Sequence, residues 1–205
     1  CEICGGTGKQ YLDSVEELIG APLLPIFKAE RVTLHGAGRE DIDAVMIGSG
    51  RPFILEIADP KIRDADPKIL EDIINAHNSG RVGVTDIRWS TRSEVETLKN
   101  HKGHKKYRIL VDIDGSIPDT TLHSAVQQLS GAIIHQRTPT RVAHRRADKV
   151  RERGVLDFRY TGKEGKDFVL EVTGEAGLYI KELISGDQGR TTPSLTEVLN
   201  TPARV

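Results

Sequence analysis

The sequence predicts an α+β domain in which a mixed, mostly antiparallel sheet is flanked by helices. Strand-like and helix-like stretches follow one another without a strict βαβ alternation, which argues against a doubly wound parallel sheet. Hydrophobic residues make up 37% and charged residues 29% of the 205 residues, so the chain can form a sizeable core. Two strand-like stretches, 155–160 and 167–173, are joined through Gly162 and Gly165, which is typical of a hairpin.

The first half of the chain alternates between helical and extended stretches. Asp13 or Ser14 can cap a short helix whose first turn carries Glu16 and Glu17, and prolines at 22 and 25 end it. Pro67 suits the first turn of a second helix. We therefore expect strands at 31–35, 52–58 and 82–90, a glycine-punctuated loop at 36–51, and helices at 67–77 and 92–100.

The second half continues the same mixture. We expect a strand at 106–114, a helix at 120–129, an apolar run at 132–134, the hairpin at 155–173, and helices at 176–185 and 194–200.

Charge and composition exclude several classes of protein. Lys and Arg (29) nearly balance Asp and Glu (30), so a nucleic-acid site must come from local clustering. Aromatic residues make up only 4%, which argues against a surface that stacks many bases. No apolar run approaches the ~20 residues of a membrane span, and nothing resembles a secretory signal. We therefore expect a cytoplasmic protein without a membrane partner.

Two cysteines, Cys1 and Cys4, form a single C-x-x-C at the start of the chain. Such a motif supplies two ligands, whereas a structural zinc needs four. We therefore expect the chain to be a fragment whose remaining zinc ligands lie upstream.

A glycine-rich segment at 35–43 carries one Arg and three acids, Glu40, Asp41 and Asp43. Its glycines allow tight turns that bring these side chains into a small region. The segment suits a solvated loop whose charges pair with one another. On the residues alone we favour this explanation over the alternative, a carboxylate held on a rigid loop as a nucleophile, base or metal ligand.

A basic segment at 137–153 has the strongest local charge asymmetry in the chain. It holds seven Lys or Arg residues against two acids, Asp148 and Glu152. An ordinary basic face is one explanation, but we favour a track for nucleic-acid phosphates.

Two further segments, taken alone, need only a structural explanation. Residues 174–190 contain an amphipathic helix opened and closed by glycines, with Lys181 on its polar side. Tyr107 stands at the entrance of an apolar strand, where tyrosine usually packs.

Five motifs keep their order across nearly the whole chain. They are S-V-E-E-L-I at 14–19, G-R-E-D-I-D at 38–43 with G-x-G-R-P-F at 48–53, Q-x-T-P-x-R-V-x-H-R-R at 136–146, G-x-Y-I-K-E at 177–182, and G-D-x-G-R-T at 186–191. Together they resemble the archaeal and eukaryotic tRNA pseudouridine synthases that modify the T-loop uridines at nucleotides 54 and 55.

The resemblance implies an organisation and a set of roles. Residues 1–30 would be the end of an upstream zinc-bearing region plus a connector helix, and 31–205 a pseudouridine synthase catalytic domain without its C-terminal strand. Asp41 matches the catalytic aspartate, and Lys181 the basic residue that pairs with it. Tyr107 matches the tyrosine on the flipped uracil and Ile180 an apolar wall. The tRNA would be bound by Arg39, Arg141, His144, Arg145 and Arg146.

These residue types suit the chemistry that the resemblance implies. The uracil must leave the ribose at N1, rotate and rejoin through C5, and a carboxylate can assist this step. A cation keeps a buried carboxylate ionised, and an aromatic ring supports an unstacked base. Catalysis needs no cofactor, so we expect zinc only as a structural ion of the full-length protein. The expected partner is the tRNA T-arm, bound by a monomer.

Val45 stands where the family usually has Arg, a departure that affects a backbone or substrate contact but not the nucleophile. Two other functions remain open on the sequence. One is a non-catalytic tRNA-binding module; the other is a glycosidase or nuclease that uses Glu40, Asp41 and Asp43.

Overall fold

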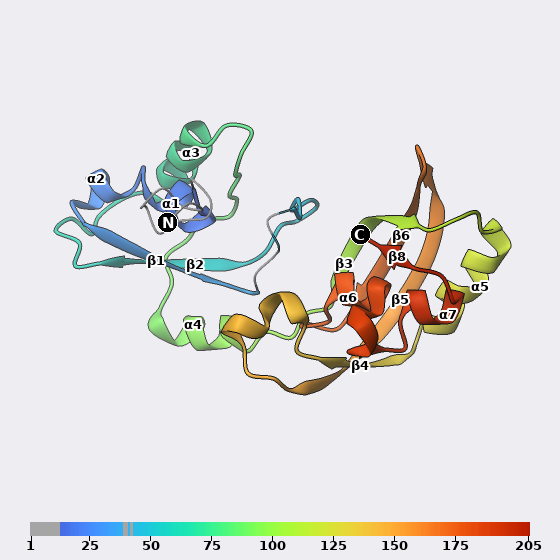
Figure 1. Cartoon of the computed structure of the whole chain (residues 1–205). Helices are drawn as coiled ribbons and strands as arrows, with labels where there is room; N and C mark the ends of the chain where they lie inside the picture. Colours follow the sequence, from blue (N-terminus) through green and yellow to red (C-terminus); the bar gives the residue numbers. More distant parts are fainter. Residues whose placement is uncertain (1–12, 39–40, 42) are drawn as a thin grey trace, which may run out of the picture. The chain divides into compact units, whose positions relative to one another are not determined.

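The chain folds into two compact units, Cys1–His101 and Lys102–Val205, called here the N-terminal and C-terminal units (Figure 1). The structure is a computed structural model that describes residues 13–38, 41 and 43–205, except for the side chain of Arg145. The predicted boundary between a zinc-bearing region with its connector helix (1–30) and a catalytic domain (31–205) stays a prediction. The predicted C-terminal strand also stays a prediction.

The N-terminal unit begins with the predicted capped helix, α1 (Val15–Gly20). The Ser14 hydroxyl accepts a hydrogen bond from the Glu17 amide at 3.2 Å, and the Glu17 carboxylate accepts one from the Ser14 amide at 3.0 Å. This capping box satisfies two amides that the helix itself leaves without acceptors. Pro25 does not simply end the helix, because it lies in the first turn of a short second helix, α2 (Leu24–Phe27).

The remaining elements of this unit enclose a small core. Strand β1 (Arg31–Gly36) pairs antiparallel with β2 (Phe53–Ala58), and helix α3 (Pro67–His77) has the predicted bounds. Helix α4 (Arg92–Lys99) also lies where it was predicted. The core consists of Ile19, Leu23, Phe27, Leu70, Ile74 and Val84.

The strand predicted at 82–90 is wrong. These residues form no ladder, because side chains of α3 bond to their backbone instead. The Asn75 amide donates to the Val84 carbonyl at 2.9 Å and accepts from the Val84 amide at 2.7 Å. Glu71 accepts from the Ile87 amide at 3.1 Å. The alternation that suggested a strand instead turns Val84 into the core.

The C-terminal unit contains a six-stranded sheet in the order β7-β4-β5-β6-β3-β8, with antiparallel neighbours throughout. The strands are β3 (Lys105–Ile113), β4 (Ile133–Arg137), β5 (Val150–Glu164), β6 (Asp167–Gly174), β7 (Thr191–Thr192) and β8 (Ala203–Arg204). The predicted hairpin joins β5 to β6, where Glu164 pairs with Asp167 and Gly165 adopts a φ of 62°. The α+β class with a mostly antiparallel sheet is confirmed.

Helices α5 (Asp119–Leu129), α6 (Ile180–Ser185) and α7 (Leu195–Leu199) bury their apolar residues with one face of this sheet. Two short 3-10 helices, η1 (Thr140–Arg145) and η2 (Gly186–Gly189), complete the unit. Helix α6 begins at 180, four residues later than the predicted start at 176. None of the described helices is long and apolar enough to cross a membrane.

Candidate active site

The predicted nucleophile, Asp41, lies in the loop between β1 and β2. The ends of this loop are joined, because the Ala37 amide donates to the Pro52 carbonyl at 3.2 Å and Arg51 Nη1 donates to the Ala37 carbonyl at 3.3 Å. Gly38 takes a φ of 107°, which an L side chain rarely adopts. Asp41 is half-buried, and its carbonyl accepts from the Ala44 amide at 3.1 Å. The described part of the loop thus has a fixed base, and the Asp41 backbone is bonded to that of Ala44.

The other charged residues of this loop have different outcomes. Asp43 is exposed, while Arg39 and Glu40 lie outside the described residues. Val45, which replaces the family's Arg, exposes 83% of its surface.

The C-terminal unit brings two predicted pocket residues onto the same core. Tyr107 lies on β3 opposite Val172 of β6, and Ile180 is the first residue of α6. Both side chains are partly buried and pack against the hydrophobic core of this unit. Lys181 follows on the same helix and is half-buried. Ile180 and Lys181 therefore both lie in the first turn of α6, whose position is fixed by contacts described next.

The anchor at the start of α6 is the side chain of Gln136. This residue of β4 is fully buried, and its amide bonds twice to the backbone of Tyr179, the N-cap residue of the helix. Gln136 Nε2 donates to the Tyr179 carbonyl at 2.9 Å, and the Tyr179 amide donates to Gln136 Oε1 at 2.8 Å. Tyr179 has no cap bond from its own side chain, and Gln136 instead holds both backbone polar groups of this N-cap residue.

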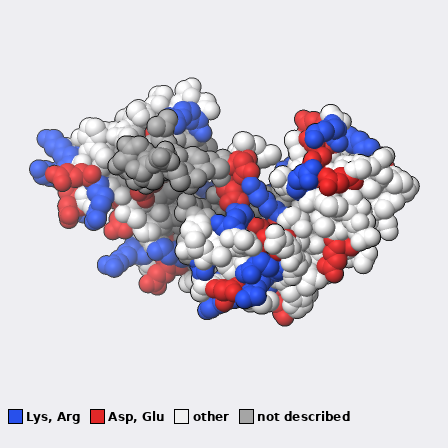
Figure 2. Space-filling view, in the orientation of Figure 1, with Lys and Arg blue, Asp and Glu red and all other residues white. Residues whose placement is uncertain are grey.

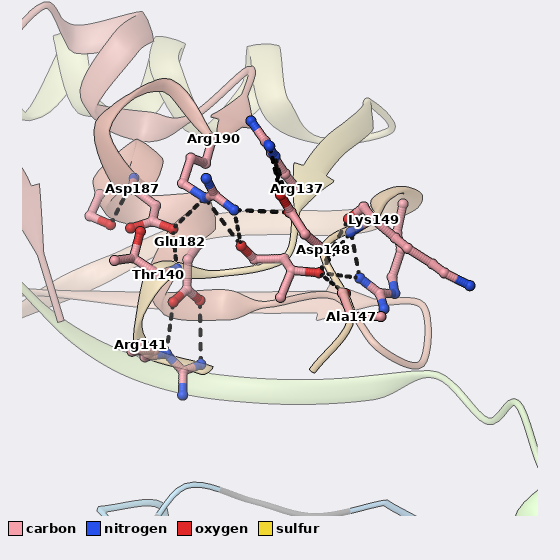
Figure 3. Close-up of polar contacts among 12 residues, drawn as sticks. Arg137, Thr140, Arg141, Ala147, Asp148, Lys149, Glu182, Asp187 and Arg190 are labelled. Carbon is pink, nitrogen blue, oxygen red and sulfur yellow. Dashed lines mark hydrogen bonds and ion pairs between the residues drawn. The ribbon is translucent and has the colours of Figure 1, made fainter. Parts of the chain in front are cut away.

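A second anchor is an ion pair between Arg141 and Glu182, drawn in Figure 3. Arg141 Nε donates to Glu182 Oε1 at 2.7 Å, and Arg141 Nη2 donates to Oε2 at 3.3 Å. The Glu182 side chain is only 5% exposed, whereas that of Arg141 is 35% exposed. A buried carboxylate is stable only with a well-placed partner, and the two-pronged guanidinium provides one.

Beside this ion pair, Arg190 and Asp148 tie together segments that are distant in sequence (Figure 3). Arg190 donates to the Thr138 carbonyl at 2.7 and 3.1 Å and to Asp148 Oδ1 at 3.1 Å. Asp148 also receives Nη2 of Arg137 at 2.6 Å. The hydrogen bond from Arg137 is the main cause that lowers the pKa of Asp148, and desolvation, the next largest cause, opposes it. Asp187 accepts from the Thr140 amide at 2.9 Å, which joins η2 to η1.

The cations of the basic segment at 137–153 therefore differ in their contacts, and Arg151 and Arg153 donate to neutral oxygens of the segment itself. Arg137 and Arg141 are held by carboxylates of the protein itself. His144, Arg146 and Lys149 are exposed, and no ion pair or hydrogen bond of their side chains occurs within the described part of the chain. Figure 2 agrees with this mixture, since Lys and Arg on the visible face lie beside Asp and Glu instead of forming one uniform basic surface.

Several residues of this arrangement were not predicted as site residues. Its main contacts are made by Gln136, Glu182, Asp148 and Arg190. All of these except Asp148 lie within the motifs. Their roles depend on partners some 40 or more positions away, as in the pairs Gln136–Tyr179 and Arg141–Glu182. The signal available in the sequence was the co-occurrence of the motifs at 136–146, 177–182 and 186–191.

Other predicted site residues are not tested by these contacts. Asp41 belongs to the N-terminal unit and Lys181 to the C-terminal unit, so their predicted pairing stays a prediction. The zinc prediction falls on Cys1 and Cys4, outside the described residues. Within the described residues no group of three or more His, Cys, Asp or Glu side chains is arranged to hold a metal ion.

Comparison with known proteins identifies the family. The family model described as "Pus10, C-terminal" matches residues 3–205. The chain belongs to the Pus10 C-terminal family. This agrees with the resemblance carried by the five motifs, and with the contacts that join three of them.

Curated relatives of the Pus10 family are close in sequence. The chain is 48% identical over 205 residues to "tRNA pseudouridine synthase Pus10" of Methanothrix thermoacetophila. The aligned region covers 100% of this chain and 45% of that protein. The protein of the same name from Archaeoglobus fulgidus is also 48% identical, with 57% of its length covered. The chain thus spans about half the length of the curated relatives it matches.

A solved structure supports the fold. The structure titled "Crystal Structure of a Cbf5-Nop10-Gar1 Complex" matches with a TM-score of 0.57 and covers 94% of this chain and 43% of that one. At 19% identity this likeness concerns the fold alone.

Proposed function

We propose that this chain is the catalytic part of a tRNA pseudouridine synthase that isomerises uridine 54, uridine 55 or both in the T-loop. The observation that carries the proposal is that side-chain contacts around α6 join the motifs at 136–146, 177–182 and 186–191. Gln136 holds Tyr179, Arg141 holds Glu182 and Arg190 holds the Thr138 carbonyl, so the segment with Ile180 and Lys181 is fixed from several sides. The names of the curated relatives support the same activity.

In the proposed reaction Asp41 is the nucleophile on a uridine flipped out of its stack. The bond between uracil N1 and ribose C1′ breaks, the base rotates, and a bond from C5 to C1′ forms; the proton lost from C5 is balanced by one gained at N1. A carboxylate assists by stabilising or trapping the ribose while the base is detached. Tyr107 supports the uracil ring, Ile180 bounds it with an apolar wall, and Lys181 keeps the nucleophile ionised.

The partner proposed for this reaction is the T-arm of tRNA, bound by a monomer. Arg39, His144, Arg145 and Arg146 are the proposed phosphate contacts, since neutralised phosphates supply most of the affinity for a nucleic acid. Catalysis needs no cofactor in this scheme. Cys1 and Cys4 are proposed to complete a structural zinc site with upstream ligands.

The test is Asp41→Asn in the full-length protein. Asn keeps the size and polarity of the side chain but removes its charge and nucleophilicity. We expect tRNA binding within about twofold of wild type and at least ~100-fold slower pseudouridine formation, because even a misplaced nucleophile costs about that much. The measurement is pseudouridine mapping at nucleotides 54 and 55 of a tRNA transcript.

Asp43→Asn is the matched control, since Asp43 is exposed and two positions away. It should retain measurable activity. Full turnover by Asp41→Asn, with deamidation excluded by mass spectrometry, would contradict the assignment. If the wild-type protein binds tRNA but forms no pseudouridine, the result would favour the non-catalytic tRNA-binding module instead.

A further inference from the structure

We propose that Arg141 is a positioning residue for Lys181 and not a phosphate contact. This inference rests on the proposed function, and it corrects the role that the sequence suggested for one member of the basic segment. It states that η1 and α6 act as one rigid element through the Arg141–Glu182 ion pair. Lys181 precedes Glu182 directly, so the ion pair fixes the helical turn from which Lys181 projects.

The first argument is the geometry of the ion pair. Nε and Nη2 of Arg141 both donate to Glu182, at 2.7 and 3.3 Å, so one edge of the guanidinium is occupied by the protein itself. Arginine is suited to this contact because its planar fork matches both carboxylate oxygens. An RNA phosphate that competed for this edge would leave the Glu182 charge buried without its partner, which is strongly unfavourable.

The second argument is the contrast with the other cations of the segment. Arg146 and Lys149 are exposed, and within the described residues their side chains have no ion-pair partner. Arg141 bonds to a carboxylate that is 5% exposed, so its charge is largely neutralised where it stands. A phosphate track gains counterion release from cations that are not already paired. The exposed group meets this condition, and Arg141 does not.

The third argument is that α6 depends on contacts from outside the helix. It has only six residues, Ile180–Ser185, which is too short to be stable alone. Gln136 fixes the start of α6 through the Tyr179 backbone. The orientation of the following residues about the helix axis must be set by other contacts. Leu183 and Ile184 are buried in the core, and the Glu182 ion pair holds a different side of the turn. Together these contacts set the direction of Lys181.

The decisive variant is Arg141→Lys, because it keeps the charge but loses the fork. A positioning role predicts that the single-turnover rate at saturating tRNA falls at least 10-fold, since small displacements of a reacting group are costly. The dissociation constant for tRNA should stay within about twofold, and the slope of log K against log salt should be unchanged. Glu182→Gln should give the same pattern, and the double variant should be no worse than either single one.

Arg146 provides the matched control within the same segment. Arg146→Ala should weaken tRNA binding and reduce the salt slope by about one unit, the amount expected for one lost phosphate contact. Arg146→Lys should retain both affinity and slope.

A readout without tRNA separates this inference from the proposed function. Amide hydrogen exchange at Leu183 and Ile184, the first amides bonded within α6, should accelerate in Arg141→Lys and Glu182→Gln but not in Arg146→Lys. If wild type forms no pseudouridine, the proposed function fails, whereas the exchange result still tests the anchor. The inference is overturned if Arg141→Lys exchanges like wild type. It is equally overturned if Arg141→Ala lowers the salt slope by one unit while turnover at saturation stays intact.

Discussion

Replacing Gln136 by Leu tests how much the clamp on Tyr179 contributes to the C-terminal unit. Leu is close in size and apolar, so the fully buried site stays filled while both hydrogen bonds are lost. The Tyr179 amide then has no partner, which costs ~1–3 kcal/mol for a buried donor. The Tyr179 carbonyl still accepts from the Leu183 amide at 3.0 Å. Loss of its hydrogen bond from Gln136 therefore costs only ~0.5–1.5 kcal/mol.

We therefore expect Gln136→Leu to lower the free energy of unfolding by about 3 kcal/mol in urea titrations followed by circular dichroism. The local effect should be larger than the global one. Amide exchange at Tyr179 should accelerate strongly, because its acceptor is gone, while exchange in the β5–β6 hairpin follows global stability.

Gln127→Leu is the control, since Gln127 lies exposed on α5 and makes no hydrogen bond with its side chain within the described residues. It should change stability by no more than about 0.5 kcal/mol. If Gln136→Leu is as stable as this control, or if the Tyr179 amide remains protected, then the two hydrogen bonds do not fix the start of α6.

Two further outcomes follow from side-chain contacts elsewhere. Arg137 lowers the pKa of Asp148 in the folded chain, so this carboxylate stabilises the fold above its unfolded pKa of about 3.9, and the contribution is lost as pH falls through the folded value. Asp148→Asn should therefore lose stability at neutral pH, and in urea titrations its difference from wild type should shrink as pH falls below about 3.9; an unchanged pH profile would contradict the ion pair. Asn75→Ala should cost ~1–3 kcal/mol and accelerate exchange at the Val84 amide, which loses its 2.7 Å acceptor. Protection of Val84 in that variant would mean that another group holds the segment.

Much of the fold was predictable because it follows local patterns. The bounds of α3 come from a capping Asp66, Pro67 at the first turn and a helical apolar period, all of which are adjacent in sequence. The β5–β6 hairpin likewise follows from Gly165 at a turn that needs a positive φ. The candidate site was predictable only in part. Motifs indicated Ile180 and Lys181, but nothing local shows that Arg141 bonds to Glu182, 41 positions later.

Two of the errors in the predicted secondary structure share a physical feature. The helix predicted from 176 starts at 180, and the strand predicted at 82–90 is absent. In both places a side-chain amide occupies the N–H and C=O of a single residue, Gln136 at Tyr179 and Asn75 at Val84.

An amide side chain carries one donor group and one acceptor, so it can replace the partner strand or the preceding helical turn that a backbone normally requires. The segment then remains irregular without leaving backbone groups unsatisfied, even when its apolar residues alternate. Such a clamp is invisible in hydrophobic periodicity, because the residue that provides it lies 43 positions away in one case and 9 in the other. A buried or half-buried Asn or Gln inside a strongly patterned helix or strand is therefore the signal to look for, since an amide withdrawn from water requires partners that its own element cannot supply.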